Sequence, residues 1–219
     1  MRILVTSDFH GSTEAARKAA LKAKDVGAAA IVVCGDITHF GSLKDAKGVL
    51  SPLITSGVPT LYVPGNCDSP ELAKTPIAGA IFLHGTCVNQ TGVTFLGLGG
   101  APVSPFHTLF ELSESEIMRI LNDAVGQCPR NKWFVVVSHA TPKDTRVDST
   151  SSGIHAGSTS LRRFIEENKP NAVFGGHIHE ARAIDYIGET VIVNPGPARH
   201  GNCAVADLND KIDVTLNSL

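Results

Sequence analysis

Residues 2–10, RILVTSDFH, join a run of strand-forming residues directly to Asp8 and His10. The run is apolar and partly β-branched, which favours a buried strand. The same change from an apolar run to a polar cluster occurs four more times, at Gly35-Asp36, Gly65–Asp68, Ser138-His139 and Gly176–His179. Ligand-binding groups of open α/β sheets collect at the carboxyl ends of the strands, so we expect all five clusters to meet at one edge.

The side chains gathered in this way have the chemistry of a metal site. They are two aspartates, one asparagine and four histidines: Asp8, His10, Asp36, Asn66, His139, His177 and His179. Such a mixture suits Mn²⁺, Fe, Zn²⁺, Ni²⁺ or Co²⁺, whereas Mg²⁺ and Ca²⁺ prefer oxygen ligands. Two cations about 3.5–4 Å apart can clamp a phosphate and activate water. The sequence therefore predicts two divalent transition metal ions, with Mn²⁺ as first choice and Asp36 as the bridging carboxylate.

Length, charge and cysteine content restrict the class of protein. A chain of 219 residues predicts a single domain, residues 1–219. The net charge of −2 and the lack of a basic run argue against binding extended nucleic acid. No run approaches the length of a membrane helix and no leader precedes Arg2, so we expect no membrane partner and a cytoplasmic location. Five cysteines without framework spacing predict reduced thiols. The sequence leaves a homo-oligomer open.

The order of expected elements predicts an α/β fold. Strands are expected at 2–7, 29–34, 60–63, 81–83, 87–89, 93–98, 133–137, 172–175, 181–187, 190–194, 202–207 and 213–216. Helices are expected at about 12–26, 42–55, 113–127 and 158–168. The strands at 81–83, 87–89 and 93–98 are close together and are expected to be linked by hairpins, whereas 99–112 and 141–157 are expected to be loops. Parallel units at the start and a meander at the end predict two sheets packed face to face, with helices outside.

The five clusters, in order, resemble the motifs of the calcineurin-like metallophosphoesterase superfamily. They stand here as DFH, GDITH, GNCD, SH and GHIH, and the resemblance extends from Asp8 to Gly196. The GNCD form is similar to a small prokaryotic and archaeal branch that favours phosphodiesters. The resemblance implies an α/β/β/α sandwich of two mixed sheets flanked by helices. It also implies one metal held by Asp8, His10, Asp36 and His179, and a second held by Asp36, Asn66, His139 and His177.

Three positions depart from the family pattern. Cys67 stands where the family has the histidine that protonates the leaving group, and His39 stands where an aspartate supports that histidine. Phe40 replaces the arginine of the protein phosphatases in the family. Without a general acid, esters with poor leaving groups are expected to be cleaved about 10²–10⁴-fold more slowly. His39 is the candidate stand-in proton donor and His155 a candidate substrate-facing group. Cys67 is open to interpretation as a buried filler, an outer thiol or a soft metal ligand.

Two functions of different class follow from these observations. The first is a dinuclear phosphodiesterase that hydrolyses a small organic or nucleotide diester by attack of a metal-bridging hydroxide. Its expected catalytic residues are Asp36, Asn66, His139, His155 and His39. The alternative is a non-catalytic metal-binding scaffold of the same fold. The complete ligand set argues against the scaffold, because a scaffold has no physical need to keep it.

Overall fold

The computed structural model describes residues 1–129 and 131–219. Its strand β2 (Ala30–Cys34) shows why the sheets are buried on both faces. Side chains alternate across a strand, so Ala30, Val32 and Cys34 pack between the two sheets. Ile31 and Val33 point the other way and pack against the helices. Every position must therefore be apolar or small, which explains the uninterrupted hydrophobic run.

The first sheet is mixed and contains six strands. Its strands from β1 to β4 run parallel, β13 pairs antiparallel with β1, and β14 pairs antiparallel with β13. Its order is β14 (Ile212–Ser218), β13 (Asn202–Leu208), β1 (Arg2–Thr6), β2, β3 (Thr60–Val63) and β4 (Ile81–Phe82).

The second sheet is also mixed and six-stranded. Strands β12, β10, β9 and β6 run parallel, and β11 and β5 close its two edges antiparallel. Its order is β11 (Ala183–Ile187), β12 (Thr190–Asn194), β10 (Ala172–Phe174), β9 (Trp133–Ser138), β6 (Val93–Leu98) and β5 (Cys87–Gln90).

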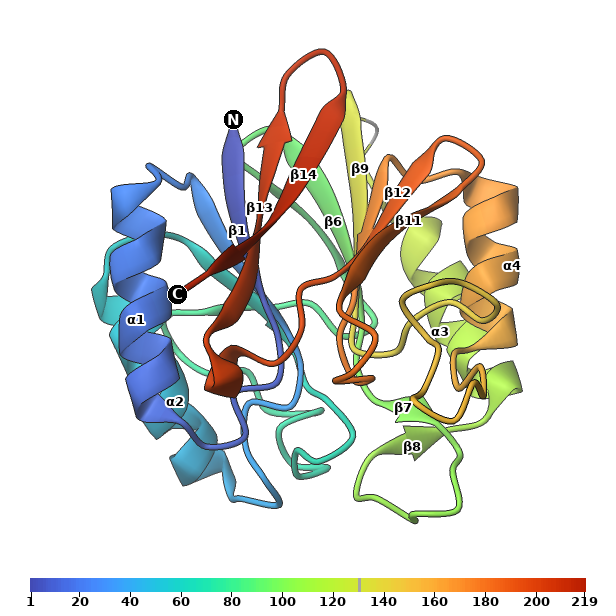
Figure 1. Cartoon of the computed structure of the whole chain (residues 1–219), viewed down its shortest axis with the longest axis horizontal. Coiled ribbons are helices and arrows are strands. Elements are labelled where there is room, and N and C mark those ends of the chain that lie inside the picture. The colour runs from blue at the N-terminus through green and yellow to red at the C-terminus, as the bar shows by residue number, and fades with distance from the viewer. Residues whose placement is uncertain (130) are drawn as a thin grey trace.

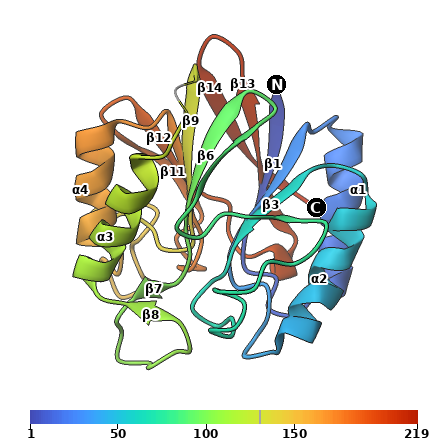
Figure 2. The same cartoon turned by 180° about the vertical axis from the view of Figure 1, so that it is seen from behind.

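Four α-helices form the outer layers, two on each sheet (Figures 1 and 2). Helices α1 (Thr13–Asp25) and α2 (Leu43–Thr55) cover the first sheet, and α3 (Glu114–Val125) and α4 (Thr159–Asn168) cover the second. A serine caps the start of each helix by accepting a backbone N–H: Ser12, Ser42, Ser113 and Ser158. No helix in the described ranges is long and apolar enough to span a membrane.

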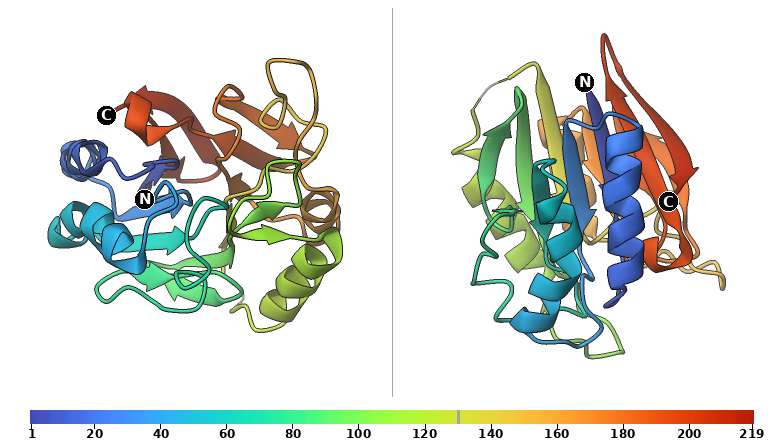
Figure 3. Two further views of the ribbon diagram at one scale, coloured as in Figure 1. Left: turned by 90° about the horizontal axis from the view of Figure 1, so that it is seen from below. Right: turned by 90° about the vertical axis from the view of Figure 1, so that its left-hand side faces the viewer.

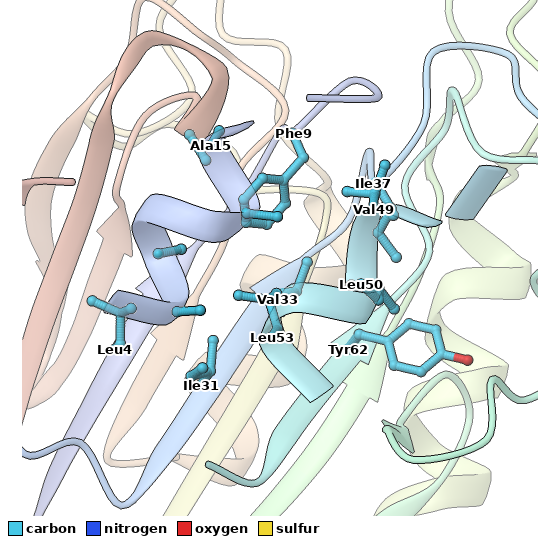
Figure 4. Close-up of a cluster of buried hydrophobic side chains, with 14 of the residues drawn as sticks. Leu4, Phe9, Ala15, Ile31, Val33, Ile37, Val49, Leu50, Leu53 and Tyr62 are labelled. Carbon is cyan, nitrogen blue, oxygen red and sulfur yellow. The ribbon is translucent and has the colours of Figure 1, made fainter. Parts of the chain in front are cut away.

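The packing gives three apolar layers, which confirms the expected α/β/β/α sandwich. One layer lies between each helix pair and its sheet, and the third lies between the sheets. Figure 4 shows the first of these, where Phe9, Ile37 and Val49 pack with the start of α1. The right-hand view of Figure 3 shows α1 lying along its sheet. Strands β1 and β9 run downwards in Figure 1, and β2, β3 and β10 run parallel to them in their sheets, so the loops that follow all five lie on the lower side.

The middle of the chain differs from the expected series of hairpins. Strand β4 pairs in parallel with β3 in the first sheet, and the chain then crosses to the second sheet. Strands β5 and β6 do form a hairpin, through Thr91 and Gly92, both with positive φ, as a tight hairpin turn requires. The sequence of these short runs does not indicate which of the two sheets each strand joins. The loop at 99–112 also contains a short parallel pair, β7 (Ala101–Pro102) and β8 (Glu111–Leu112).

A disulfide between Cys87 and Cys128 overturns the expectation that all cysteines are reduced. It joins β5 to the segment after α3, whereas Cys34, Cys67 and Cys203 are free and buried. Spacing along the chain could not reveal the pair, because the two positions are separated by 41 residues and meet only in the fold.

Replacing both Cys87 and Cys128 by serine should lower the free energy of unfolding by about 3 kcal/mol, because the cross-link restricts the unfolded chain. Denaturant titration of the variant and the oxidised wild type measures this loss. Alkylation of the denatured, unreduced protein should label the three free thiols and leave the disulfide pair unmodified. Labelling of all the cysteines would show that the bond does not form.

Candidate metal centre

The backbone bends sharply at the residues expected to bind metal. Asp8, His10, Asp36 and His177 have φ values of 57°, 45°, 47° and 70°, in the left-handed region that non-glycine residues rarely adopt. Each such residue costs of order 1–3 kcal/mol and persists only where its surroundings enforce it. Backbone bonds supply that constraint: the Asp8 N–H donates to the Gly35 carbonyl at 3.0 Å, and the His10 N–H donates to the Asp36 carbonyl at 2.9 Å.

Two glycines allow the loops to approach closely. A Cβ at Gly65 would overlap the Asp36 carboxylate, and a Cβ at Gly176 would overlap the Ser7 side chain. No side chain therefore fits at either position without displacing a neighbour. The glycines of the GNCD and GHIH motifs are needed for space around the carboxylates.

Four donor atoms form a first group around His10. The His10 Nε2 atom lies 3.1 Å from His179 Nε2, 3.7 Å from Asp8 Oδ1 and 3.6 Å from Asp36 Oδ2. The separation of His179 Nε2 from Asp8 Oδ1 is 3.3 Å. Ligand atoms at about 2.1 Å from a tetrahedral ion lie about 3.4 Å from one another. The spacing of these atoms therefore fits a single coordinated cation.

The charge of Asp8 agrees with this interpretation. Its carboxylate is only 1% exposed, and burial raises its pKa. Hydrogen bonds with His10 and His179 outweigh burial and hold the pKa well below its ordinary value. The group is therefore an anion at neutral pH, as a metal ligand must be.

A second donor group contains His139 and Asn66. The His139 ring is fully buried, and its Nδ1–H donates to the Cys34 carbonyl at 2.7 Å. Its Nε2 faces the amide oxygen of Asn66 at 2.8 Å and Asp36 Oδ1 at 3.4 Å. With Nδ1 as donor to Cys34, Nε2 either carries a proton that these oxygens accept or offers a lone pair to a cation that they share.

The pKa of His139 also reflects the negative charge around it. Burial lowers its pKa, but Asp36 and Asp8 raise it by more, so the net pKa is above the ordinary value. His177 packs beside it with ring centroids 5.0 Å apart. Burial, followed by repulsion from His139, lowers the pKa of His177 to about 4, which keeps this ring neutral.

Asp36 connects the two donor groups. Its Oδ2 atom faces His10, whereas its Oδ1 atom faces His139 and accepts the Cys67 N–H at 2.8 Å. Aspartate, asparagine and histidine at these spacings fit a pair of borderline divalent cations.

Three further residues position the ligands and were not fully recognised in the sequence. Asp68 accepts the backbone N–H groups of 37, 38 and 65, so it fixes the two loops that carry Asp36 and Asn66. Asn194 donates to the carbonyls of residues 147, 176 and 178, which holds the GHIH turn. No sequence pattern around Asn194 marked it.

Thr108 orients Asn66 from the 99–112 loop. The Asn66 amide donates to the Thr108 hydroxyl at 3.1 Å, which turns the amide oxygen towards His139. Glu111 in turn accepts from the Thr108 hydroxyl at 2.7 Å and from the Ser104 hydroxyl at 2.7 Å. The loop at 99–112 therefore orients an expected metal ligand.

Two of the three residues that depart from the family pattern, His39 and Cys67, lie close together beside His10. His39, His10 and Cys67 have ligand atoms within 4.8 Å of one another, and the His39 and His10 rings are 5.4 Å apart. Burial and the neighbouring Asp36 raise the pKa of the Cys67 thiol well above its ordinary value, so it is a neutral thiol. Cys67 is buried, which agrees with a filler, whereas His39 is exposed.

His155 is held at the surface, apart from the two donor groups. Its Nδ1 lies 2.7 Å from the fully buried carboxylate of Asp148, which raises the pKa of His155. The loop that carries it is joined to the turn after β10 by the bond from the Ser151 N–H to Glu180 at 3.2 Å. The structure thus orients His155 but shows no contact between it and the expected ligands.

The fold and this site agree with the family comparison. The family described as calcineurin-like phosphoesterase matches residues 1–181, so the chain belongs to the calcineurin-like phosphoesterase family. A relative in Methanocaldococcus jannaschii, the uncharacterized protein MJ1162, is 37% identical over 201 residues. The match covers 90% of this chain and 88% of the relative. Proteins of this family act on phosphoric esters and use divalent metal ions.

Solved structures share the fold across almost the whole chain. The protein TT1561 of Thermus thermophilus has a TM-score of 0.78 and 20% identity, covering 99% of this chain and 98% of its own. A dimetal phosphatase from Danio rerio has a TM-score of 0.68 and 13% identity, covering 100% and 96%. An archaeal phosphodiesterase has a TM-score of 0.58 and 15% identity, covering 100% of both chains. At these identities the likeness concerns the fold.

Replacing Thr108 by valine should weaken metal binding at the Asn66 and His139 group by about tenfold, because the Asn66 amide loses the hydroxyl that orients it. Calorimetric titration with Mn²⁺ measures the change. Thr108→Ser keeps the hydroxyl and serves as the control. Equal affinity in the valine and serine variants would contradict the positioning role.

Proposed function

We propose that the protein is a dinuclear metal-dependent phosphodiesterase acting on a small organic or nucleotide phosphodiester. The observation that carries the proposal is the division of the Asp36 carboxylate between two donor groups, with one oxygen towards each. One group is Asp8, His10 and His179, and the other is Asn66, His139 and His177. A carboxylate placed in this way suits a pair of adjacent cations better than a single ion.

The residues of each group have distinct tasks in this proposal. Two divalent cations, Mn²⁺ first and otherwise Fe, Zn²⁺, Ni²⁺ or Co²⁺, would supply Lewis acidity to a phosphoryl group and a source of nucleophilic water. Asp8 and Asp36 supply the negative charge that holds them, while Cys34 fixes the tautomer of His139. Thr108 keeps the Asn66 oxygen turned inward.

A diester is proposed over a monoester because of the charge to be bound. A monoester carries about two negative charges at neutral pH, whereas a diester carries one. Phe40, 51% exposed beside His39, occupies the position at which related protein phosphatases have an arginine. The archaeal phosphodiesterase of similar fold supports this choice, while the fold of the Danio rerio dimetal phosphatase would equally admit a monoester.

His39 and His155 are proposed for different tasks. His39 lies against His10 and Cys67, so we assign it protonation of the leaving group. His155, oriented by Asp148 on the adjacent loop, is assigned a contact with the more distant part of the substrate. Each assignment follows from where the side chain is held relative to the donor groups.

A non-catalytic scaffold is the second candidate, favoured by Cys67 at the position of the family's acid. A cytoplasmic location is proposed together with a small-molecule substrate, and the Cys87–Cys128 bond is the observation that speaks against that location. The oligomeric state in solution, monomer or homo-oligomer, is open to measurement by light scattering.

Wild-type protein loaded with Mn²⁺ should hydrolyse bis(4-nitrophenyl) phosphate, and Asp36→Asn should reduce kcat by on the order of a thousandfold. Elemental analysis should show two ions per chain in the wild type and fewer in the variant. Asp213→Asn, on the surface of β14, is the matched control. Two bound ions without hydrolysis of any diester would favour the scaffold.

His39→Gln should slow cleavage of a diester with an alkoxide leaving group about a hundredfold more than cleavage with a nitrophenolate leaving group, since only the former needs a proton. His155→Gln should instead raise KM for both substrates. Steady-state kinetics of the two variants on the two substrates separates the roles. Equal losses on both leaving groups in His39→Gln would rule out proton donation.

A further inference from the structure

A cavity of about 570 Å³ adjoins the metal centre on the side of the first helix pair. Residues at the starts of α1 and α2 line it, and these helix starts lie at the lower left in Figure 1. His10, a member of the first donor group, forms part of its wall, together with His39, Thr13 and Lys44. The cavity therefore borders the first donor group through His10.

Lys44 is the basic residue of the cavity lining, and Asp45 is the acidic one. Lys44 makes no ion pair with any acid in the described ranges. The two nearby acids are already engaged: Asp45 accepts from the Ser42 N–H and hydroxyl, and Glu14 pairs with basic residues of its own helix. The first turns of both helices also direct N–H groups and positive dipole ends to this region.

Two further observations point to an occupant. The His10 side chain is 5% exposed, and its Nδ1 atom is buried without a hydrogen-bond partner among the described residues. A buried polar atom without a partner is rare in folded proteins and calls for an explanation. Gly48 lies inside α2, where glycine costs up to about 1 kcal/mol relative to alanine. A Cβ at Gly48 would have no atom within 4 Å, so packing does not require a glycine there. Gly48 lines the cavity without a side chain.

We propose that this cavity binds the alcohol part of the diester, and that this part carries a second anionic group that pairs with Lys44. The inference rests on the proposed function and narrows its substrate class to phosphodiesters with an additional phosphate or carboxylate. The scissile group lies at the two donor groups, and the second anion lies between the starts of α1 and α2.

A series of α,ω-alkane bisphosphonates of increasing chain length tests the inference without turnover. One phosphonate occupies the metal centre of the Mn²⁺-loaded protein, and the other reaches the cavity at a suitable length. Calorimetry should show one length that binds about tenfold more tightly than the alkyl monophosphonate of equal length, as expected for a charge-assisted pair. Equal affinity of the two series at every length would overturn the inference.

Variants locate the second phosphonate. Lys44→Met and Gly48→Phe should remove the tenfold advantage, the first by loss of charge and the second by filling the cavity. Lys47→Met, on the same helix and outside the cavity lining, should keep it, and Gly48→Ala, which adds a single methyl group, should keep it as well. An advantage that survives Lys44→Met would also overturn the inference. Binding of neither phosphonate series would instead refute the proposed function itself.

Discussion

The hydrogen bond from His139 Nδ1 to the Cys34 carbonyl is the contact on which the site most depends. Cys34 ends β2 in the first sheet, and His139 follows β9 in the second, so this bond joins the two halves of the sandwich. It also leaves Nε2 directed at Asn66 and Asp36. Packing of the sheets and the chemistry of the site are thus determined together, because a shift of one sheet would separate His139 from the donor group.

The sequence predicted most of the fold because both faces of the central strands are buried. Runs such as Ile31–Cys34 must then be apolar throughout, and their abrupt ends at polar residues mark the carboxyl ends of the strands. Helix starts were equally visible, since Ser42 and Ser113 form capping boxes within a few residues of the chain. Strand runs and helix caps depend on residues close together in the chain, so a single sequence is enough to predict them.

Features that depend on distant contacts could not be predicted. The placement of β4 in the first sheet and the pairing of Cys87 with Cys128 depend on how the sheets are joined. The candidate ligands were recognised from their motifs, but the residues that orient them were recognised only in part. Asn194 and Thr108 act through carbonyl and amide groups far away in the sequence, and an isolated asparagine or threonine carries no pattern. His155 was named as a candidate from the sequence, but the sequence did not show that Asp148 would hold its side chain.

The distribution of the donor atoms over both sheets has a consequence for stability. His10 and Asp36 come from the first sheet, while His139 and His179 follow strands of the second. A cation that draws these atoms together would act as a cross-link between two segments more than 100 residues apart. Ligands that bind only the folded state stabilise it by mass action. The free energy of unfolding would therefore vary with the free metal concentration around the protein. Metal depletion would first weaken the contact between the two sheets at the donor groups.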